Sequence, residues 1–333
     1  MRDIANYSLK EHNTFGIEAR CSRFLEYSTV EEAKAVAAIL RETGAPYIII
    51  GGGSNLLLTR DFEGIVVHSA LTGIDIDGCR MTCGSGMEWD KAVALAVEQG
   101  LYGAENLSLI PGDVGASAVQ NIGAYGAEAK DLIRSIRAVE IATGNLCVIE
   151  NAECEYGYRQ SRFKQDWKNQ YLIVSVEYVF SDTFVPRLDY GNIRNELERR
   201  GIVHPTALQV RETVIDIRRA KLPDPEVMGN AGSFFMNPVV DREKFEQLQA
   251  LYPQMPHYYI DERHEKIPAG WMIEQCGWKG RSLGRAGVHD KQALVLVNLG
   301  GATGDEILTL CNTVRKDVKT KFGIDIHPEV NVV

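Results

Sequence analysis

The stretch GNAGSFFMNP, residues 229–238, places the hydroxyl of Ser233 after two glycines and before two phenylalanines. A catalytic serine nucleophile typically lies in a G-x-S-x-G turn, which requires a glycine two residues after the serine. Phe235 occupies that position, so the sequence does not predict a nucleophile elbow. Three alternatives remain for Ser233: a proton donor, a turn residue, or no special role.

The segment YIIIGGGSNLLL, residues 47–58, is the first of two glycine-rich segments. A G-x-G-x-x-G fingerprint starting at Gly51 would need a third glycine where the chain has Leu56, so a Rossmann dinucleotide site is not expected. Consecutive glycines expose backbone N–H groups that can bind an anion, although a plain turn between strands is also possible. The candidate residues are Gly51, Gly52, Gly53, Ser54 and Asn55.

The second segment, LIPGDVGASAVQNIGAYGAE at residues 109–128, combines many small residues with few charges. An ordinary surface loop does not need this composition, whereas a backbone that approaches a flat, extended ligand does. Two such segments predict a large phosphate-bearing cofactor. The small residues considered are Gly112, Gly115, Ala116, Gly123 and Ala124, and the polar ones are Ser117, Gln120 and Asn121.

Helical and strand patterns alternate irregularly along the chain, which favours an α+β fold over a doubly wound α/β fold. A capping box at Thr29-x-x-Glu32 opens a predicted helix over 29–44, and a second box at Thr303-x-x-Glu306 opens one over 304–321. Further helices are predicted at 88–99, from 207, at 241–251 and at 269–276. Strands are predicted at 46–50, 64–68, 171–180, 293–298 and the chain end, with a hairpin over 134–150. Residues 101–126 and 181–205 show little periodicity.

The bulk composition is that of a globular protein with two or three domains. The 333 residues are 45% hydrophobic and 24% charged, and the net charge of −9 argues against nucleic acid or a membrane surface as a partner. No apolar run matches a signal peptide or a membrane span, so we expect a cytoplasmic protein. The seven cysteines form no C-x-x-C pair and show no zinc spacing, so we expect reduced thiols and no metal site.

Six motifs in this order resemble those of the UDP-N-acetylenolpyruvoylglucosamine reductase family, over nearly the whole chain. They are GGGSNLLL, IPGDVGASAVQNIGAYGAE, YGYRQSRFK, KLPDP, GNAGSFFMNPVV and HPEVNVV. The resemblance implies an FAD-binding fold of the vanillyl-alcohol-oxidase (PCMH) type in two subdomains, with a smaller α+β substrate-binding domain. The implied boundaries are 1–68, joined by 328–333, then 69–217, and 218–327 for the substrate domain.

The resemblance also implies the reaction and the cofactor. NADPH reduces non-covalently bound FAD, which then reduces the enolpyruvyl group of a UDP-sugar to give UDP-N-acetylmuramate for peptidoglycan. Within the two glycine-rich segments it adds Pro111 and Tyr125 to the cofactor-binding residues. Residues 187–201 resemble a tyrosine-bearing loop found in one of the family's two forms, so Tyr190 is expected to close over the substrate.

Three residues match the family's catalytic positions. Hydride addition to an enol ether leaves negative charge beside a carboxylate, and that charge needs preorganised donors. Arg159 matches the carboxylate-binding arginine, Glu329 the catalytic glutamate, and Ser233 the proton donor. Ser233 is therefore predicted to act as a general acid. Lys221, Asn237 and Gln292 match positions that hold the diphosphate and uridine, and Arg218 and Arg219 add positive charge beside Lys221.

Some features leave alternatives open. Met236 stands where relatives often have lysine, and the chain stops four residues after Glu329. Both features bear on the strength of substrate binding more than on the type of reaction. His68 is the residue to check for covalent flavin attachment, which related oxidases use. The competing functions are an oxidase of a small hydroxy acid, and a UDP-sugar-binding protein without catalysis. We expect a monomer.

Overall fold

The structure is a computed structural model that describes residues 1–333, and it divides into two compact units. The first unit comprises Met1–Tyr7, Cys21–Gly52 and Glu63–Ala220, and the second comprises Ser8–Arg20, Gly53–Phe62 and Lys221–Val333. Each unit mixes sheets with helices. The predicted further division of the first unit into two FAD-binding subdomains stays a prediction.

The first sheet of the first unit is covered by helix α1 (Val30–Thr43). The sheet has the order β1 (Arg2–Ser8), β2 (Arg20–Tyr27), β5 (Phe62–Ser69) and β3 (Tyr47–Ile50), with β3 parallel to β5. The Thr29 hydroxyl accepts a hydrogen bond from the backbone N–H of Glu32, and Gly44 ends the helix in a left-handed conformation. The helix predicted from the capping box is therefore confirmed.

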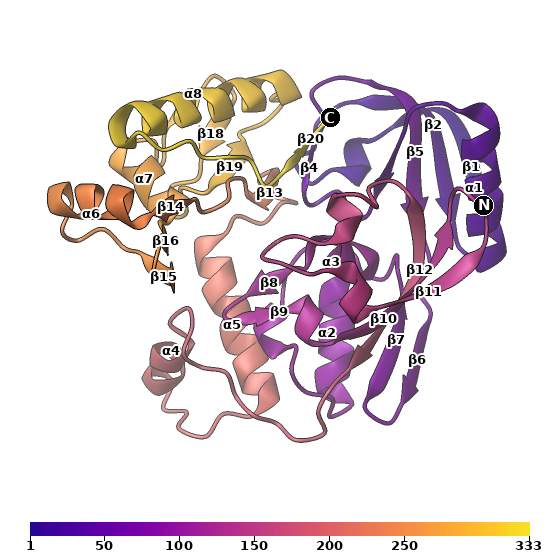
Figure 1. The fold of residues 1–333 in the computed structure, drawn as a ribbon, viewed down its shortest axis with the longest axis horizontal. Coiled ribbons are helices and arrows are strands. Elements are labelled where there is room, and N and C mark those ends of the chain that lie inside the picture. Colours follow the sequence, from indigo (N-terminus) through magenta and orange to yellow (C-terminus); the bar gives the residue numbers. More distant parts are fainter. The chain divides into compact units, whose positions relative to one another are not determined.

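The second sheet of the first unit is antiparallel and holds the predicted hairpin. Its order is β11 (Leu146–Glu150), β10 (Ile133–Glu140), β12 (Tyr171–Val179), β7 (Arg80–Gly84) and β6 (Ile74–Asp77). Helix α1, which Figure 1 shows beside the first sheet, also contacts the second, because its buried stripe packs with residues of β10 and β12. The stripe consists of Ala33, Val36, Ala37 and Leu40.

Two helices cover the other side of the second sheet and form the main core with it. Helix α2 (Trp89–Glu98) was predicted, whereas α3 (Val114–Gln120) lies in the segment for which no helix was predicted. Because α3 is built from small residues, its sequence lacks the large apolar stripe that marks a helix. The short hairpin of β8 (Gly123–Ala124) and β9 (Ala127–Glu128) follows it, and the 3-10 turn η2 (Glu105–Leu107) precedes it.

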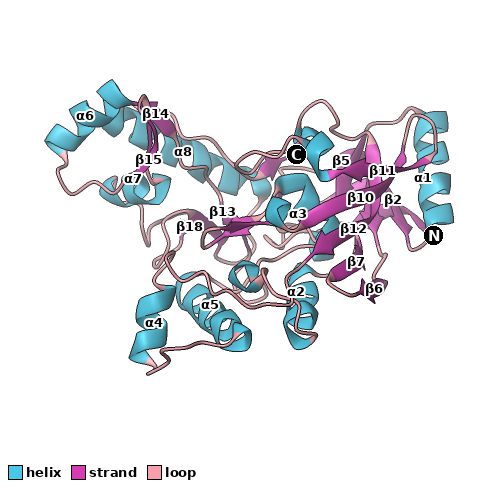
Figure 2. Ribbon diagram, turned by 60° about the horizontal axis from the view of Figure 1, so that its bottom comes forward, coloured by secondary structure: helices cyan, strands magenta, loops and turns pink.

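The polar excursion 181–205 contains a second helix that was not predicted, α4 (Ile193–Arg199). Figure 2 shows α4 beside α5 (Ala207–Lys221), and the two helices share a small apolar cluster. Because α4 buries only Ile193 and Leu197, its apolar pattern is too short to stand out from a charged segment.

The second unit contains two sheets and the chain end. Helix α8 (Gly304–Phe322) packs on the sheet β13 (Asn230–Ser233), β19 (Val295–Asn298), β18 (Ala286–Val288), β17 (Ser282–Leu283), as Figure 1 shows. The three-stranded sheet is β14 (Val239–Asp241), β16 (His264–Lys266), β15 (Tyr258–Asp261), with α6 (Arg242–Leu251) and α7 (Ala269–Gln275) nearby in sequence. The last strand, β20 (Asn331–Val332), pairs parallel with β4 (Leu56–Leu57). None of the helices combines the length and apolarity that crossing a membrane requires.

A largely buried ion pair joins α5 to α2 in the first unit. The Arg211 guanidinium donates to both carboxylate oxygens of Asp90, at 2.7 and 2.9 Å. Asp90 also accepts a hydrogen bond from the backbone N–H of Leu109, the residue at which the second glycine-rich segment begins. Burial would raise the pKa of Asp90, but Arg211 and the Leu109 N–H together hold that pKa below its ordinary value.

We expect Asp90→Asn to lower the free energy of unfolding by about 3 kcal/mol at pH 7, because a buried guanidinium is left without a counter-charge. Urea unfolding followed by circular dichroism measures this. The folded-state pKa of Asp90 lies below the unfolded value of about 3.9. The pair therefore stabilises above about pH 4, and its contribution disappears as the pH falls through the lower, folded-state pKa.

The matched control is Asp216→Asn, which removes one of the two acidic partners of Arg200 at an exposed position and should change stability by less than about 0.5 kcal/mol. Equal effects of the two substitutions at pH 7, or an Asp90→Asn deficit that persists unchanged at pH 2, would contradict the assignment.

Candidate functional site

In the second unit, Ser233 lies beside the chain-end segment that carries Glu329. The backbone N–H of Glu329 donates to the Phe234 carbonyl at 2.8 Å, and the N–H of Met236 donates to the His327 carbonyl at 3.0 Å. Ser233 itself ends strand β13, opposite Val295 of β19, and its side chain is exposed. Main-chain pairing thus brings two of the predicted catalytic residues together from positions 96 apart in the sequence.

Buried aromatic rings anchor this part of the backbone. Phe234 and Phe235 are 0% and 1% exposed, and their rings pack edge to face at 5.3 Å. Gly232 precedes Ser233 with φ of 67°, a left-handed conformation that favours glycine, and its N–H donates to the Asn230 side chain. The Ser233 hydroxyl is therefore presented at the surface by a strand whose next two side chains are fixed in the core.

The chain end fixes the backbone around Glu329 although it is only four residues long. The Asn331 N–H donates to the Asn55 carbonyl at 3.1 Å, and the Val333 carbonyl accepts from the Thr59 N–H at 2.7 Å. The Asn55 side chain approaches the Glu329 carbonyl at 3.4 Å. Asn55, predicted to bind the cofactor, thus also has a structural role next to a predicted catalytic residue.

Two of the predicted substrate residues gather at the start of α7. The Asn237 side-chain oxygen accepts a hydrogen bond from the Ala269 N–H at 2.9 Å. A Cβ atom added at Gly270 would lie 3.2 Å from the side-chain oxygen of Gln292. Lys221 is exposed at the last position of α5, and Met236 is half-buried. The structure therefore brings Asn237 and Gln292 to one place.

The first glycine-rich loop has different constraints at its successive glycines. Gly53 has φ of 67°, and a Cβ there would lie 2.0 Å from the His12 carbonyl oxygen, so only glycine fits for reasons of backbone packing. Gly51 and Gly52 lie over Asp113, where a Cβ would stand 3.2 Å from a carboxylate oxygen in each case. Bare backbone at Gly51 and Gly52 suits the close approach of a phosphate-bearing cofactor.

A histidine lies between two carboxylates near this loop, and one of them is Asp113. His68 Nδ1 lies 3.0 Å from Glu26, and its Nε2 lies 3.7 Å from Asp113. Burial alone would lower the pKa of His68, but the hydrogen bonds to Asp113 and Glu26 raise it above its ordinary value. Both ring nitrogens face carboxylates, an arrangement that favours non-covalent rather than covalent flavin attachment.

Several polar side chains of the second segment are used inside the protein. The Ser117 hydroxyl donates to the Val114 carbonyl and lies 2.8 Å from the Tyr178 hydroxyl, with 1% of Ser117 exposed. The Asn121 amide donates to Glu128 and to the Gly157 carbonyl, and its oxygen accepts from the Lys130 N–H. If Ser117 and Asn121 contact a cofactor, their backbone atoms are the groups left to do so.

The remaining predicted residues of this segment present backbone or small side chains. Ala116 borders Gly51, and Gly115 packs so closely on Ser85 that a Cβ would stand 3.0 Å from its side chain. Gly112 has φ of 110°, a conformation that favours glycine. The other residues predicted here to bind the cofactor are Pro111, Gln120, Gly123, Ala124 and Tyr125, and Ser54 belongs to the first loop.

Arg159 and Arg218 form a cationic pair in the first unit. Arg159 has φ of 56°, a conformation that is strained for a residue with a side chain and is found at functional sites. Its Nη2 donates to the Gly123 carbonyl. Burial lowers the pKa of Arg218, and the positive charge of Arg159 lowers it further, while Tyr125 and Asp90 oppose the shift. Arg218 Nε is buried without an acceptor in the protein, so the pair fits an anionic ligand.

Three residues that contact predicted site residues were not themselves predicted to have a role in the site. They are Arg218, Asp113 and Asn106. The signal for Arg218 was its helical spacing of seven from Arg211, which directs both residues of α5 to one side of the helix. No local signal marks Asn106, because its partners are the backbone carbonyls of Tyr125 and Arg187. Tyr190 is 56% exposed, and its ring lies against Gly126.

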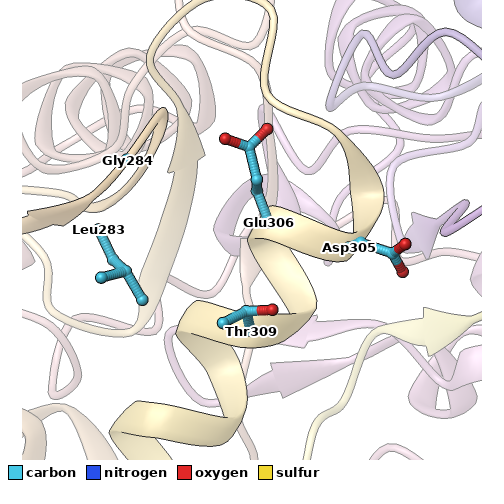
Figure 3. Close-up of a pocket in the computed structure, with 5 residues that line it drawn as sticks. All are labelled: Leu283, Gly284, Asp305, Glu306 and Thr309. Atoms are coloured by element: carbon cyan, nitrogen blue, oxygen red, sulfur yellow. The ribbon is translucent and has the colours of Figure 1, made fainter.

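A shallow hollow in the second unit, of about 260 Å³, is separate from the predicted site residues. Figure 3 shows its lining residues, which are Leu283, Gly284, Asp305, Glu306 and Thr309. The Glu306 carboxylate is already bound by Thr303 and Arg285, which hold its pKa at about 2. Two acidic residues in this lining do not suit a UDP-sugar, whose diphosphate is negatively charged. No group of three or more His, Cys, Asp or Glu residues is arranged to hold a metal ion.

Comparison with known proteins identifies two family domains. Residues 22–150 match an FAD binding domain, which includes both glycine-rich segments, and residues 224–333 match the C-terminal domain of UDP-N-acetylenolpyruvoylglucosamine reductase. The predicted FAD cofactor and the FAD-binding fold with a further α+β domain are confirmed.

Full-length relatives extend these matches. The chain is 54% identical over 332 residues to a UDP-N-acetylenolpyruvoylglucosamine reductase of Bacteroides fragilis, covering 98% of this chain and 99% of that one. A reductase of Burkholderia multivorans is 44% identical, covering 98% and 95%. The crystal structure of the Thermus caldophilus reductase aligns with a TM-score of 0.69 at 23% identity over 99% and 98% of the chains, which shows a shared fold. The chain therefore belongs to the UDP-N-acetylenolpyruvoylglucosamine reductase family and is an FAD-dependent oxidoreductase.

Proposed function

We propose that the chain reduces UDP-N-acetylglucosamine enolpyruvate to UDP-N-acetylmuramate, with NADPH as the source of the hydride, in peptidoglycan precursor synthesis. The observation that carries the proposal is the backbone pairing of Glu329 with Phe234, which brings Glu329 next to the end of the strand that exposes Ser233. A serine hydroxyl can give a proton to a strongly basic carbanion, but it is too weak a base to remove a proton from a substrate. This favours a reductase over an oxidase.

FAD held by the two glycine-rich segments would supply the redox chemistry, which is the passage of a hydride from NADPH to the terminal carbon of the enolpyruvyl double bond. The chain's residues then have to manage the electron pair that moves to the next carbon. That carbanion is stabilised by delocalisation into the adjacent carboxylate, which becomes enolate-like, and donors placed at that carboxylate lower its energy.

Arg159 is assigned to the substrate carboxylate, because a guanidinium can donate to both oxygens of a carboxylate at once. Arg218, whose buried Nε has no acceptor in the protein, adds a second positive charge beside it. Glu329 assists when it is protonated or bridged by water, since two bare carboxylates would repel. Ser233 Oγ then transfers its proton to the carbanion, and solvent protonates the resulting alkoxide to restore the hydroxyl.

The remaining assignments concern binding. Lys221, Asn237 and Gln292 are proposed to hold the diphosphate and uridine, and Tyr190 to cover the substrate. The glycine-rich segments hold the cofactor mainly through backbone atoms, since the Ser117 and Asn121 side chains are engaged inside the protein. A monomeric state, a cytoplasmic location and non-covalent attachment of FAD stay predictions.

The direct test is spectroscopic and anaerobic. We expect purified protein to show a flavin absorbance that NADPH bleaches and UDP-N-acetylglucosamine enolpyruvate restores, because the two half-reactions share one cofactor. Recovery only on admission of oxygen would favour an oxidase. A protein that binds the sugar nucleotide without restoring the absorbance would be a binding protein. Absence of flavin, even after FAD is added back, would contradict the cofactor assignment.

Substitution of Ser233 separates the proton transfer from the hydride transfer from NADPH. We expect Ser233→Ala to leave flavin reduction by NADPH nearly unchanged and to slow reoxidation by the enolpyruvyl substrate about 10²–10⁴-fold, the usual contribution of a general acid. Stopped-flow absorbance measures both steps. Ser282→Ala, at another exposed strand serine of the same unit, is the control and should change neither rate. Unchanged reoxidation in Ser233→Ala would exclude Ser233 as the proton donor.

Substitution of Arg159 tests carboxylate binding. We expect Arg159→Lys to weaken binding of the enolpyruvyl substrate to the oxidised enzyme about 10–100-fold, because an ammonium replaces a two-pronged donor; charged hydrogen bonds contribute about 1.5–3 kcal/mol. Binding is followed by the perturbation of the flavin spectrum. The control is Arg162→Lys, whose side chain pairs with Asp166 at the surface. If the two variants bind equally well, Arg159 does not hold the carboxylate.

A further inference from the structure

Two Tyr-Gly dipeptides of the first unit interlock reciprocally. Gly126 has φ of 78°, and a Cβ atom there would lie 2.7 Å from the ring of Tyr190. Gly191 has φ of 67°, and a Cβ there would lie 2.1 Å from the ring of Tyr125. Each tyrosine ring therefore rests directly on the glycine that follows the other tyrosine, with no room for a side chain at either glycine.

A buried amide joins the same two segments at their base. Asn106 is 2% exposed, and its side-chain nitrogen donates to the Tyr125 carbonyl at 2.8 Å and to the Arg187 carbonyl at 2.9 Å. The two hydrogens of the Asn106 amide thus connect Tyr125 with Arg187, which are far apart in the sequence. Loss of either bond would leave a polar group unsatisfied at a buried site, which costs about 1–3 kcal/mol.

The segment that carries Tyr190 has few other attachments. Leu188, Ile193 and Leu197 contribute to the small apolar cluster of α4 and α5, which also includes Tyr125. The flanking side chains of Asp189 and Arg194 are exposed and pair only with one another. Arg187 also lies 3.7 Å from Asp131, but both of these side chains are exposed, so this ion pair contributes little. The position of Tyr190 therefore depends largely on the interlocked dipeptides, on the apolar cluster and on Asn106.

We propose that Tyr125-Gly126, Tyr190-Gly191 and Asn106 form a clasp that holds residues 187–191 on the 123–126 turn and so sets the position of Tyr190. The same turn carries the Gly123 carbonyl that Arg159 contacts, and Tyr125 faces Arg218. The clasp thus links Tyr190 to the arginine pair. Asn106 and the two glycines act as positioning residues. The consequence for substrate binding rests on the proposed function, whereas the clasp itself does not.

Glycine substitutions test the clasp with a matched control. Gly191→Ala and Gly201→Ala both place a side chain at a left-handed φ, of 67° and 72°, but only residue 191 meets a ring, since nothing lies within 4 Å at Gly201. We expect trypsin to cleave the folded holoenzyme after Arg187 and Arg194 at least ten times faster in Gly191→Ala than in Gly201→Ala. Mass spectrometry of the fragments gives the rates. Equal rates in the two variants overturn the clasp.

Asparagine substitutions give an independent test. Asn106→Asp replaces two N–H donors by an oxygen, and Asn151→Asp does the same at a second amide that donates to two carbonyls, those of Lys130 and Ile133. We expect only Asn106→Asp to accelerate cleavage in 187–194. In a Tyr125→Ala background the ring is absent, so Gly191→Ala should add no more than Gly201→Ala adds. Full additivity there contradicts the reciprocal contact.

Substrate binding tests the positioning role separately. We expect Gly191→Ala and Asn106→Asp, but not Gly201→Ala or Asn151→Asp, to raise the dissociation constant of UDP-N-acetylglucosamine enolpyruvate from the oxidised enzyme about tenfold. Faster cleavage with unchanged binding would mean that the clasp exists but does not position Tyr190 for the substrate. If the wild-type enzyme does not bind this compound, the proposed function fails, while the cleavage rates still decide the clasp.

Discussion

The main-chain pairing of residues 234–236 with 327–329 is the constraint on which the proposed catalytic arrangement of the second unit depends. It is made by backbone N–H and carbonyl groups, so it fixes register without relying on any side chain of the site. Buried phenylalanines hold one partner, and the short strand β20 on β4 holds the other. A residue four positions from the chain end would otherwise fray, and instead it has hydrogen-bonded neighbours on both sides.

Positive charge is concentrated locally in a chain of net charge −9. Arg211 is neutralised by Asp90, but Arg218, about two turns further along the same side of α5, has a buried nitrogen without an acceptor. Arg159 lies near it on a strained backbone. Such an arrangement is costly in the absence of an anion, because buried charges need partners. The cost is consistent with a site shaped for a ligand that carries negative charge.

The glycines of the two glycine-rich segments form one pattern in the sequence, but they are required for different structural reasons. Gly53 is required by the His12 carbonyl and Gly126 by the Tyr190 ring, whereas Gly51 and Gly52 lie against Asp113. Only for Gly51 and Gly52 do we propose that the approach of a cofactor is a reason for the glycine. The polar residues of these segments also differ in their roles, because the side chains of Ser117 and Asn121 form hydrogen bonds within the protein.

The sequence by itself determined the long elements, because capping boxes and apolar periodicity are local: α1, α8 and the hairpin of β10 and β11 lie where those signals place them. Its motifs also determined the family and the FAD-binding fold. It did not determine α3 or α4, since small or charged residues conceal a short helix. Only the tertiary structure decided that Glu329 lies beside Phe234, that Asn106 bridges Tyr125 and Arg187, and that Arg218 is buried near Arg159. These relations join positions that are far apart in the chain. They depend on backbone hydrogen bonds and on burial, which leave no pattern among neighbouring residues of the sequence.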